Sequence, residues 1–161
     1  MTIAVRPATA ADVGLIHGFV VALAVYEKLD HTVEATPADF EHLLFADPAA
    51  AFSEIVEIDG EPVGFSLSFY SVSTFTGRKG VWLEDLFVRE DARGKGAGLA
   101  LLKSLAARCM HEGLPRLEWS VLDWNAPSIA FYDAIGSDAI GDWTVRRLTG
   151  EALAKLGQAS P

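Results

Sequence analysis

Residues 81–98 have the sequence Val-Trp-Leu-Glu-Asp-Leu-Phe-Val-Arg-Glu-Asp-Ala-Arg-Gly-Lys-Gly-Ala-Gly. The first eight are apolar apart from Glu84 and Asp85, which is typical of a strand that is buried on both faces of a sheet. A turn with three glycines follows, and an amphipathic helix is expected over about 97–111. This order predicts an anion site, because glycines let backbone N–H groups converge and a helix N-terminus adds donors of its own.

The segments around this stretch predict an α/β or α+β fold. Strands are expected over 3–6, 52–58, 63–70, 81–88, 116–122 and about 142–148. Helices are expected after Thr9, Thr36, Gly96, Asn125 and Thr149, with Gly136 closing the fourth. Together these elements predict a three-layer sandwich, in which helices flank a mixed central β-sheet. With 161 residues the chain is expected to form one domain over 1–157, followed by a tail over 158–161.

The spacing of the glycine turn distinguishes among phosphate ligands. The turn cannot be aligned with a P-loop, and Leu99 stands where a dinucleotide fingerprint requires its third glycine. The pattern Arg93-x-x-Gly96-x-Gly98 has the spacing of the acyl-coenzyme A signature of the GNAT acetyltransferases, which this segment resembles. A tight connection without a ligand is the simpler alternative.

The resemblance extends over nearly the whole chain. It includes the opening 3–12, the pair Tyr26-Glu27, the strand 82–88 and the stretch from Trp124 to Tyr132. In this order the segments look most like the diamine and thialysine N-acetyltransferase branch of the GNAT superfamily. The resemblance therefore implies a GNAT-like sandwich that uses acetyl-coenzyme A as its co-substrate.

The resemblance also implies which residues hold the coenzyme. The backbone of 86–88 would pair with the pantetheine arm as an added strand, the turn would hold the pyrophosphate, and the start of the next helix would lie near the thioester. The implied residues are Leu86, Phe87, Val88, Arg93, Gly94, Lys95, Gly96, Ala97, Gly98, Asn125 and Ser128. Helix capping alone would also explain Asn125 and Ser128.

Acetyl transfer to an amine needs a proton acceptor and a proton donor. An alkyl ammonium has a pKa of about 10.4, so the substrate arrives protonated. We expect Glu84 to accept that proton, directly or through water, although it could instead form a buried ion pair. By strand alternation Asp85 is expected on the opposite face, with a structural role. Tyr132 stands where the family carries its general acid, and simple aromatic packing is the alternative.

The acceptor site is expected at Tyr26 and Glu27, together with Glu84. A carboxylate at Glu27 could bind a second ammonium and so select a diamine or a lysine-like amino acid, although it could equally be a solvated charge. Phe75 replaces a tryptophan of the resembling branch, and Ile140-Gly141-Asp142 replaces a more acidic stretch. These departures leave the identity of the amine open.

Charge and composition limit the partners. The chain has 13 Lys and Arg against 22 Asp and Glu, a net charge of -9, which argues against nucleic acid and anionic membranes. The charge is compatible with a small cationic substrate, and an acidic surface that serves solubility alone is the alternative. The single cysteine, Cys109, is expected to pack in the core. No leader and no spanning segment are evident, so a cytoplasmic protein is expected. The four histidines lack metal spacing, so no metal is expected. The resemblance alone implies a homodimer.

The sequence thus predicts an enzyme that transfers acetyl from acetyl-coenzyme A to a primary amine, a diamine, polyamine or lysine-like amino acid, by direct attack in a ternary complex. Two alternatives stay open. One is an acyl-coenzyme A binding module without transfer activity. The other is an acetyltransferase that acts on protein lysines or N-termini.

Overall fold

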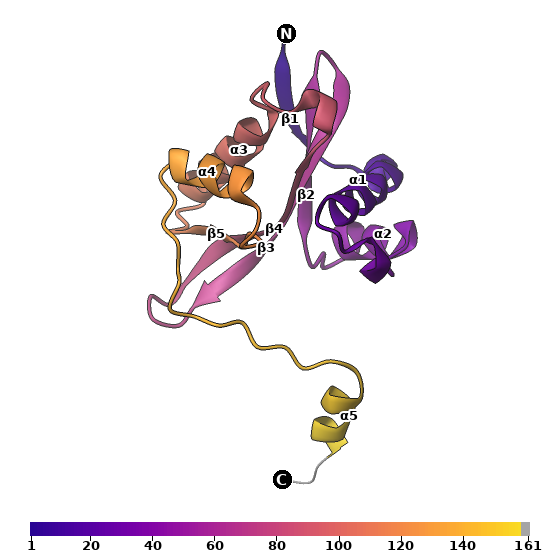
Figure 1. The fold of residues 1–161 in the computed structure, drawn as a ribbon, viewed down its shortest axis with the longest axis vertical. Coiled ribbons are helices and arrows are strands. Elements are labelled where there is room, and N and C mark those ends of the chain that lie inside the picture. Colours follow the sequence, from indigo (N-terminus) through magenta and orange to yellow (C-terminus); the bar gives the residue numbers. More distant parts are fainter. Residues whose placement is uncertain (159–161) are drawn as a thin grey trace. The chain divides into compact units, whose positions relative to one another are not determined.

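A computed structural model describes residues 1–158 (Figure 1). The strands are β1 (Ile3–Pro7), β2 (Phe52–Ile58), β3 (Glu61–Ser73), β4 (Arg78–Val88) and β5 (Leu117–Trp119). The helices are α1 (Val13–Tyr26), α2 (Pro37–Phe45), α3 (Ala97–His111), α4 (Ala126–Ala134) and α5 (Gly150–Gln158), with 3-10 turns at Ala10–Asp12, Asp30–Thr32 and Glu90–Ala92. The chain divides into two compact units, one up to Leu122 and one from Asp123 onward.

The first unit contains the whole sheet, whose strand order is β1-β2-β3-β4-β5. The first four strands pair antiparallel, and β5 pairs parallel with β4 after the α3 crossover. The sheet is therefore mixed, as the sequence predicts. Asp59 and Gly60 close the β2–β3 hairpin with φ values of 51° and 83°, which is the geometry of a primed two-residue turn.

Helices cover both faces of this sheet (Figure 1). On one face α1 and α2 bury Ile16 and Phe40 against Ile55, Phe65 and Phe87 of the strands. On the other face α3 packs through a smaller cluster, which contains Ala97, Leu101, Val56 and Val63. Each fully buried Leu, Ile or Phe contributes about 1.5–3 kcal/mol of transfer free energy, so both layers hold the sheet in place.

Polar contacts fix the beginnings of the first two helices. The Asp12 carboxylate accepts a hydrogen bond from the N–H of Thr9 at 2.8 Å. It also accepts hydrogen bonds from both terminal nitrogens of Arg6, at 2.8 and 2.9 Å. Arg6 also donates to Glu57 at 2.7 Å, so it joins β1, the start of α1 and β2. The pKa of Asp12 is held well below its usual range by this guanidinium. Thr36 and Asp39 form a capping box at the start of α2, where the sequence predicts a helix.

Two expectations about the C-terminal part are wrong. No strand forms over 142–148, where Trp143 and Val145 are 76% and 86% exposed. The alternation of these residues suits a strand, but a strand also needs a ladder partner, and the segment has none among residues 1–158. The strand expected over 116–122 is limited to Leu117–Trp119.

The second unit contains α4 and α5, and both helices form where the sequence predicts them. Gly136 ends α4 with a φ of 85°, and Ser137 N–H donates to the carbonyl of Tyr132 at 3.2 Å. This is the hydrogen-bond pattern of a glycine C-cap. The expected tail over 158–161 lies outside the described residues except for Gln158, which ends α5.

Candidate active site

The glycine turn between β4 and α3 has an anion-binding geometry. Gly94 and Gly96 have φ values of 72° and 95°, which disfavour any residue with a side chain. Gly96 is also the N-cap of α3 and has no side chain to cap it. The first N–H groups of the helix, from Ala97 onward, thus remain available as donors, and the helix dipole adds positive potential.

The two basic side chains of the turn donate hydrogen bonds to backbone carbonyls that are close to them in the sequence. Arg93 Nε donates to the carbonyl of Val88 at 3.0 Å, and Lys95 Nζ donates to the carbonyl of Asp91 at 2.9 Å. The guanidinium of Arg93 lies 4.7 Å from the centre of the Tyr26 ring. Arg93 therefore connects the turn, the end of β4 and the end of α1 through a hydrogen bond and a cation–π contact.

The end of β4 has one edge without a strand. Leu86, Phe87 and Val88 pair with β3 on one side. On the other side, in the part of the chain that the structure describes, β5 pairs only with 81–83. This leaves the outer edge of 84–88 open to an extended ligand, which suits the pantetheine role expected for 86–88.

A β-bulge interrupts β4 at Glu84. In the ladder with β3, Asp85 is opposite Leu67 and Leu83 is opposite Ser68, so Glu84 is the extra residue. Asp85 thus shares the face of Leu67, which α1 and α2 cover. Trp82 is opposite Phe69, which packs against the same core cluster as Leu67. Trp82 Nε1 donates to Glu84 Oε2 at 3.0 Å, so the Glu84 carboxylate lies on the same side of the sheet as Asp85. The expectation that the two carboxylates occupy opposite faces is therefore wrong, because a bulge breaks the strict alternation.

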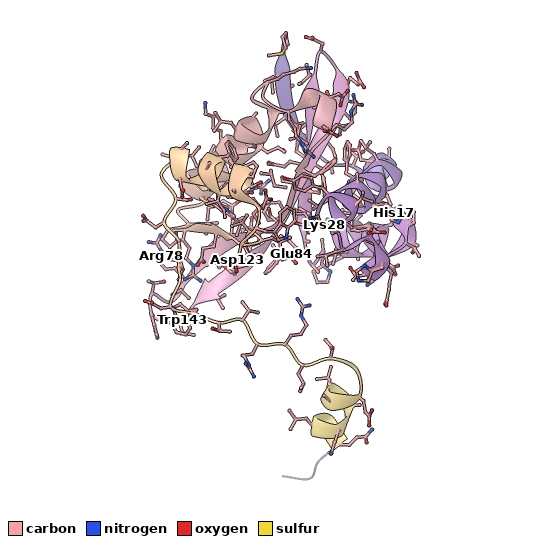
Figure 2. All side chains as sticks on the ribbon, viewed as in Figure 1. His17, Lys28, Arg78, Glu84, Asp123 and Trp143 are labelled. Carbon is pink, nitrogen blue, oxygen red and sulfur yellow. The ribbon has the colours of Figure 1, made fainter. Side chains whose placement is uncertain are left out.

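Three carboxylates lie where β4 and the end of α1 meet: Glu84 and Asp85 on β4 and Glu27 just after α1, and the charges of Glu84 and Glu27 both act on Asp85. Figure 2 labels Glu84 on β4 and Lys28, the residue after Glu27. Asp85 is half-buried, and its pKa is raised to about 6 by burial and then by the charges of Glu84 and Glu27. Burial also raises the pKa of Glu27, which follows the last residue of α1. Glu84 is exposed. This negative site favours a cation, which would relieve the repulsion among the carboxylates.

The second unit holds the other predicted site residues. Asn125 is the N-cap of α4, and its side-chain oxygen accepts the N–H of Ser128 at 3.4 Å. Tyr132 lies one turn further along α4, with its ring centre 5.4 Å from that of Phe131. The capping interpretation of Asn125 is confirmed, and a coenzyme role for it stays a prediction.

Within the first unit, the structure thus brings Tyr26 to Arg93, and Glu27 to Asp85 and Glu84. The sequence predicts only a structural role for Asp85, whereas the structure places it beside the charges of Glu84 and Glu27. The sequence does show Asp85 as a second carboxylate inside an otherwise apolar strand. The face of the sheet on which its side chain lies, however, depends on the bulge.

In residues 1–158 no group of three or more His, Cys, Asp or Glu side chains could hold a metal ion. No helix in this range is long and apolar enough to cross a bilayer.

The sequence also matches known proteins. Residues 19–136 match the acetyltransferase (GNAT) family. The chain is 35% identical to a thialysine N-epsilon-acetyltransferase of Bos taurus, covering 94% of this chain and 95% of the relative. It is 30% identical to an L-ornithine N5-acetyltransferase of Arabidopsis thaliana, covering 92% and 85%.

The fold has counterparts among solved structures. An integron cassette protein from the mobile metagenome of V. cholerae superposes with a TM-score of 0.82 at 24% identity, covering 99% of both chains. The glycine turn at the start of α3, the open edge of β4 and the family match over 19–136 lead to one assignment. The chain belongs to the GNAT family of acetyltransferases, which use acetyl-coenzyme A as their co-substrate.

Proposed function

We propose that this acetyltransferase transfers acetyl from acetyl-coenzyme A to a primary amine of a small cationic molecule. The observation that carries the proposal is the group of carboxylates Glu27, Glu84 and Asp85 beside the end of β4. Arg93 ties this region to the glycine turn through Tyr26. A negative acceptor site next to an anion-binding turn suits a cationic amine and an anionic coenzyme.

The residues fit the coenzyme. The open edge of Leu86, Phe87 and Val88 would accept the pantetheine arm, and the N–H groups of 93–98 would hold the pyrophosphate. Within that turn Gly94 and Gly96 have positive φ values and no side chains, so the backbone N–H groups can come close to the pyrophosphate. The proposal assigns Asn125 and Ser128 to the thioester end. The bound coenzyme supplies an activated thioester carbonyl.

Proton transfer falls to this chain's own side chains. In this proposal Glu84 accepts the proton of the incoming ammonium, directly or through water. Asp85, with a pKa of about 6, is mostly ionised at pH 7 and provides a second acceptor close to the operating pH. Tyr132 donates the proton of its hydroxyl to the departing sulfur, which is the role that the family resemblance implies for it.

The acceptor is proposed to carry a second charge or a polar head. The relatives named above act on thialysine and on ornithine, and each of these molecules has an amine at the end of a side chain. Glu27, at the end of α1, would bind a second ammonium of such a substrate. Diamines, polyamines and lysine-like amino acids are therefore the proposed class.

Thiol release with purified protein tests this function. Acetyl-coenzyme A is supplied with thialysine, ornithine, lysine, putrescine, spermidine or a lysine peptide. Release with the small amines, and none with the peptide, is expected. Coenzyme binding without release for any amine would indicate a binding module, and release with the peptide alone would indicate a protein acetyltransferase.

The proposal also covers organisation and location. Residues 1–157 are proposed to act as one acetyltransferase domain, supported by a family match over 19–136 that includes parts of both units. A homodimer is proposed from the resemblance and from the exposed Trp143 and Val145, and light scattering tests it. A cytoplasmic location is proposed from the single free cysteine, Cys109, and fractionation tests it.

A further inference from the structure

The side chain of Arg93 contacts two aromatic rings outside the glycine turn. Its guanidinium carbon lies 4.7 Å from the centre of the Tyr26 ring and 5.9 Å from that of the Phe87 ring. Both distances are within the ~6 Å over which a cation is attracted to a ring face. Tyr26 is the last residue of α1 and directly precedes Glu27. An arginine of the glycine turn therefore contacts the neighbour of an acceptor-site carboxylate.

The sheet holds this arginine in place from one side. Arg93 Nε donates to the carbonyl of Val88 at 3.0 Å, and the backbone N–H of Arg93 donates to the carbonyl of Glu90 at 3.2 Å. Phe87 is buried in the core that α1 and α2 form with the strands. The guanidinium thus rests on the end of β4, and Tyr26 is the ring that it contacts on α1.

The last turn of α1 has little apolar packing of its own. Val25 is exposed, and so is Leu29, which follows the helix. Ala24 is buried but has only a methyl group to pack. The contact between Tyr26 and Arg93 therefore adds a support that apolar packing supplies only weakly at this end of the helix.

Arg93 acts on the acceptor site through position and not through charge. Burial raises the pKa of Glu27. The charges that raise the pKa of Asp85, after burial, are those of Glu84 and Glu27. A guanidinium beside these carboxylates would lower both pKa values instead. The influence of Arg93 on Glu27 therefore passes through the ring of Tyr26.

We propose that the Arg93 side chain is a positioning residue for the acceptor: it holds the Tyr26 ring and so fixes the place where Glu27 meets the second ammonium of the substrate. The backbone N–H groups of the turn serve the coenzyme, whereas this side chain serves the amine. This role rests on the proposed acetyl transfer and adds a residue that selects diamines. A monoamine has no second ammonium, so its binding does not depend on where Glu27 lies.

The test measures binding of putrescine and of butylamine by calorimetry at pH 7, on the full chain saturated with coenzyme A, which carries no acetyl group to transfer. A cation–π contact at an exposed site contributes ~0.5–1 kcal/mol, which corresponds to about 2- to 5-fold in affinity. Arg93→Gln is expected to weaken putrescine binding by this factor and to leave butylamine binding unchanged. In the thiol-release assay with saturating acetyl-coenzyme A, the KM for putrescine should rise by the same factor while kcat stays.

Two control variants separate this role from general effects of charge. Arg89→Gln makes the same substitution one residue after β4, at an arginine that pairs with Glu61 and Asp91, and should leave putrescine binding unchanged. Lys95→Gln removes the other cation of the turn, which donates to the carbonyl of Asp91. It is expected to weaken coenzyme binding without the loss of putrescine affinity that Arg93→Gln causes.

Variants of Tyr26 test the route of the effect. Tyr26→Leu removes the ring and should weaken putrescine binding, whereas Tyr26→Phe keeps the ring and should retain most of what Tyr26→Leu loses. Adding Arg93→Gln to Tyr26→Leu should weaken putrescine binding no further, because the two residues act through one contact. Melting curves confirm that each variant folds. Arg93→Lys, which keeps the charge without the planar fork, is a second test should Arg93→Gln unfold.

Several results would overturn the positioning role. These are no putrescine binding to the unaltered chain, unchanged putrescine binding in Arg93→Gln, an equal loss in Arg89→Gln, or a further loss when Arg93→Gln is added to Tyr26→Leu. Failure of the proposed acetyl transfer is distinguishable, because it removes thiol release with every amine and leaves the effect of Arg93→Gln on putrescine binding in place. Thiol release together with unchanged putrescine binding in Arg93→Gln would refute the positioning role alone.

Discussion

Replacing Asp85 by asparagine is expected to stabilise the protein at neutral pH. The asparagine side chain has nearly the same shape and no charge. In the folded chain the pKa of Asp85 is raised to about 6 from an ordinary 3.8 by burial and by the charges of Glu84 and Glu27. The folded state therefore holds this proton more tightly than the unfolded state does, and ionisation of Asp85 opposes folding.

The size of the effect follows from the two pKa values. A difference of about 2 pKa units corresponds to about 3 kcal/mol, since each unit is about 1.4 kcal/mol. Linkage gives this destabilisation in full at pH 7, about 1.6 kcal/mol at pH 5 and about 0.5 kcal/mol at pH 4. Stability from this group is thus present at low pH and is lost as pH rises through the folded pKa, and Asp85→Asn removes that loss.

Urea unfolding of both proteins at pH 7, 5 and 4 measures the difference. The advantage of the variant should be largest at pH 7 and nearly vanish at pH 4. Asp138→Asn, an exposed carboxyl replacement in the second unit, is the matched control and should show no such trend. A variant no more stable than the unaltered chain at pH 7, or an advantage of equal size at all three pH values, would refute the reasoning.

Four other outcomes are expected. Tyr132→Phe should lower kcat by about 100-fold or more while acetyl-coenzyme A affinity, measured by calorimetry, stays nearly unchanged. Glu27→Gln should raise the KM for diamines and leave the KM for monoamines unchanged in the same thiol-release assay. Arg6→Ala should lower the unfolding free energy by about 1 to 2 kcal/mol at pH 7. Because Arg6 lowers the pKa of Asp12, that loss should shrink as pH falls below about 4, and equal losses at pH 7 and pH 3 would contradict the ion-pair account. Gly64→Ala should lower the melting temperature markedly, since a Cβ there would collide with the β4 backbone, and an unchanged melting temperature would argue against that packing.

Features that depend on neighbouring residues could be predicted from the sequence. The capping box at Thr36, the glycine turn and the start of α3 are local, because glycine geometry and cap hydrogen bonds involve residues a few positions apart. The glycine turn also carried part of the family resemblance. The β2–β3 hairpin also followed from its two-residue turn.

Features that depend on distant pairing could not be predicted. The bulge at Glu84 exists only in relation to β3, so alternation along β4 wrongly predicted that Glu84 and Asp85 lie on opposite faces. Trp143 and Val145 alternate as a strand would, yet no strand within residues 1–158 pairs with this segment.

The bulge in β4 also places the residue proposed for proton transfer outside the pairing that forms the sheet. Among residues 78–88, Glu84 alone has no partner in the ladder with β3. The strand segments before and after it pair with consecutive β3 residues. Deleting Glu84 would therefore close the ladder without turning any other β4 side chain to a new face. The proposed proton acceptor occupies a position that the sheet does not need, and this leaves it open to change while the scaffold stays the same.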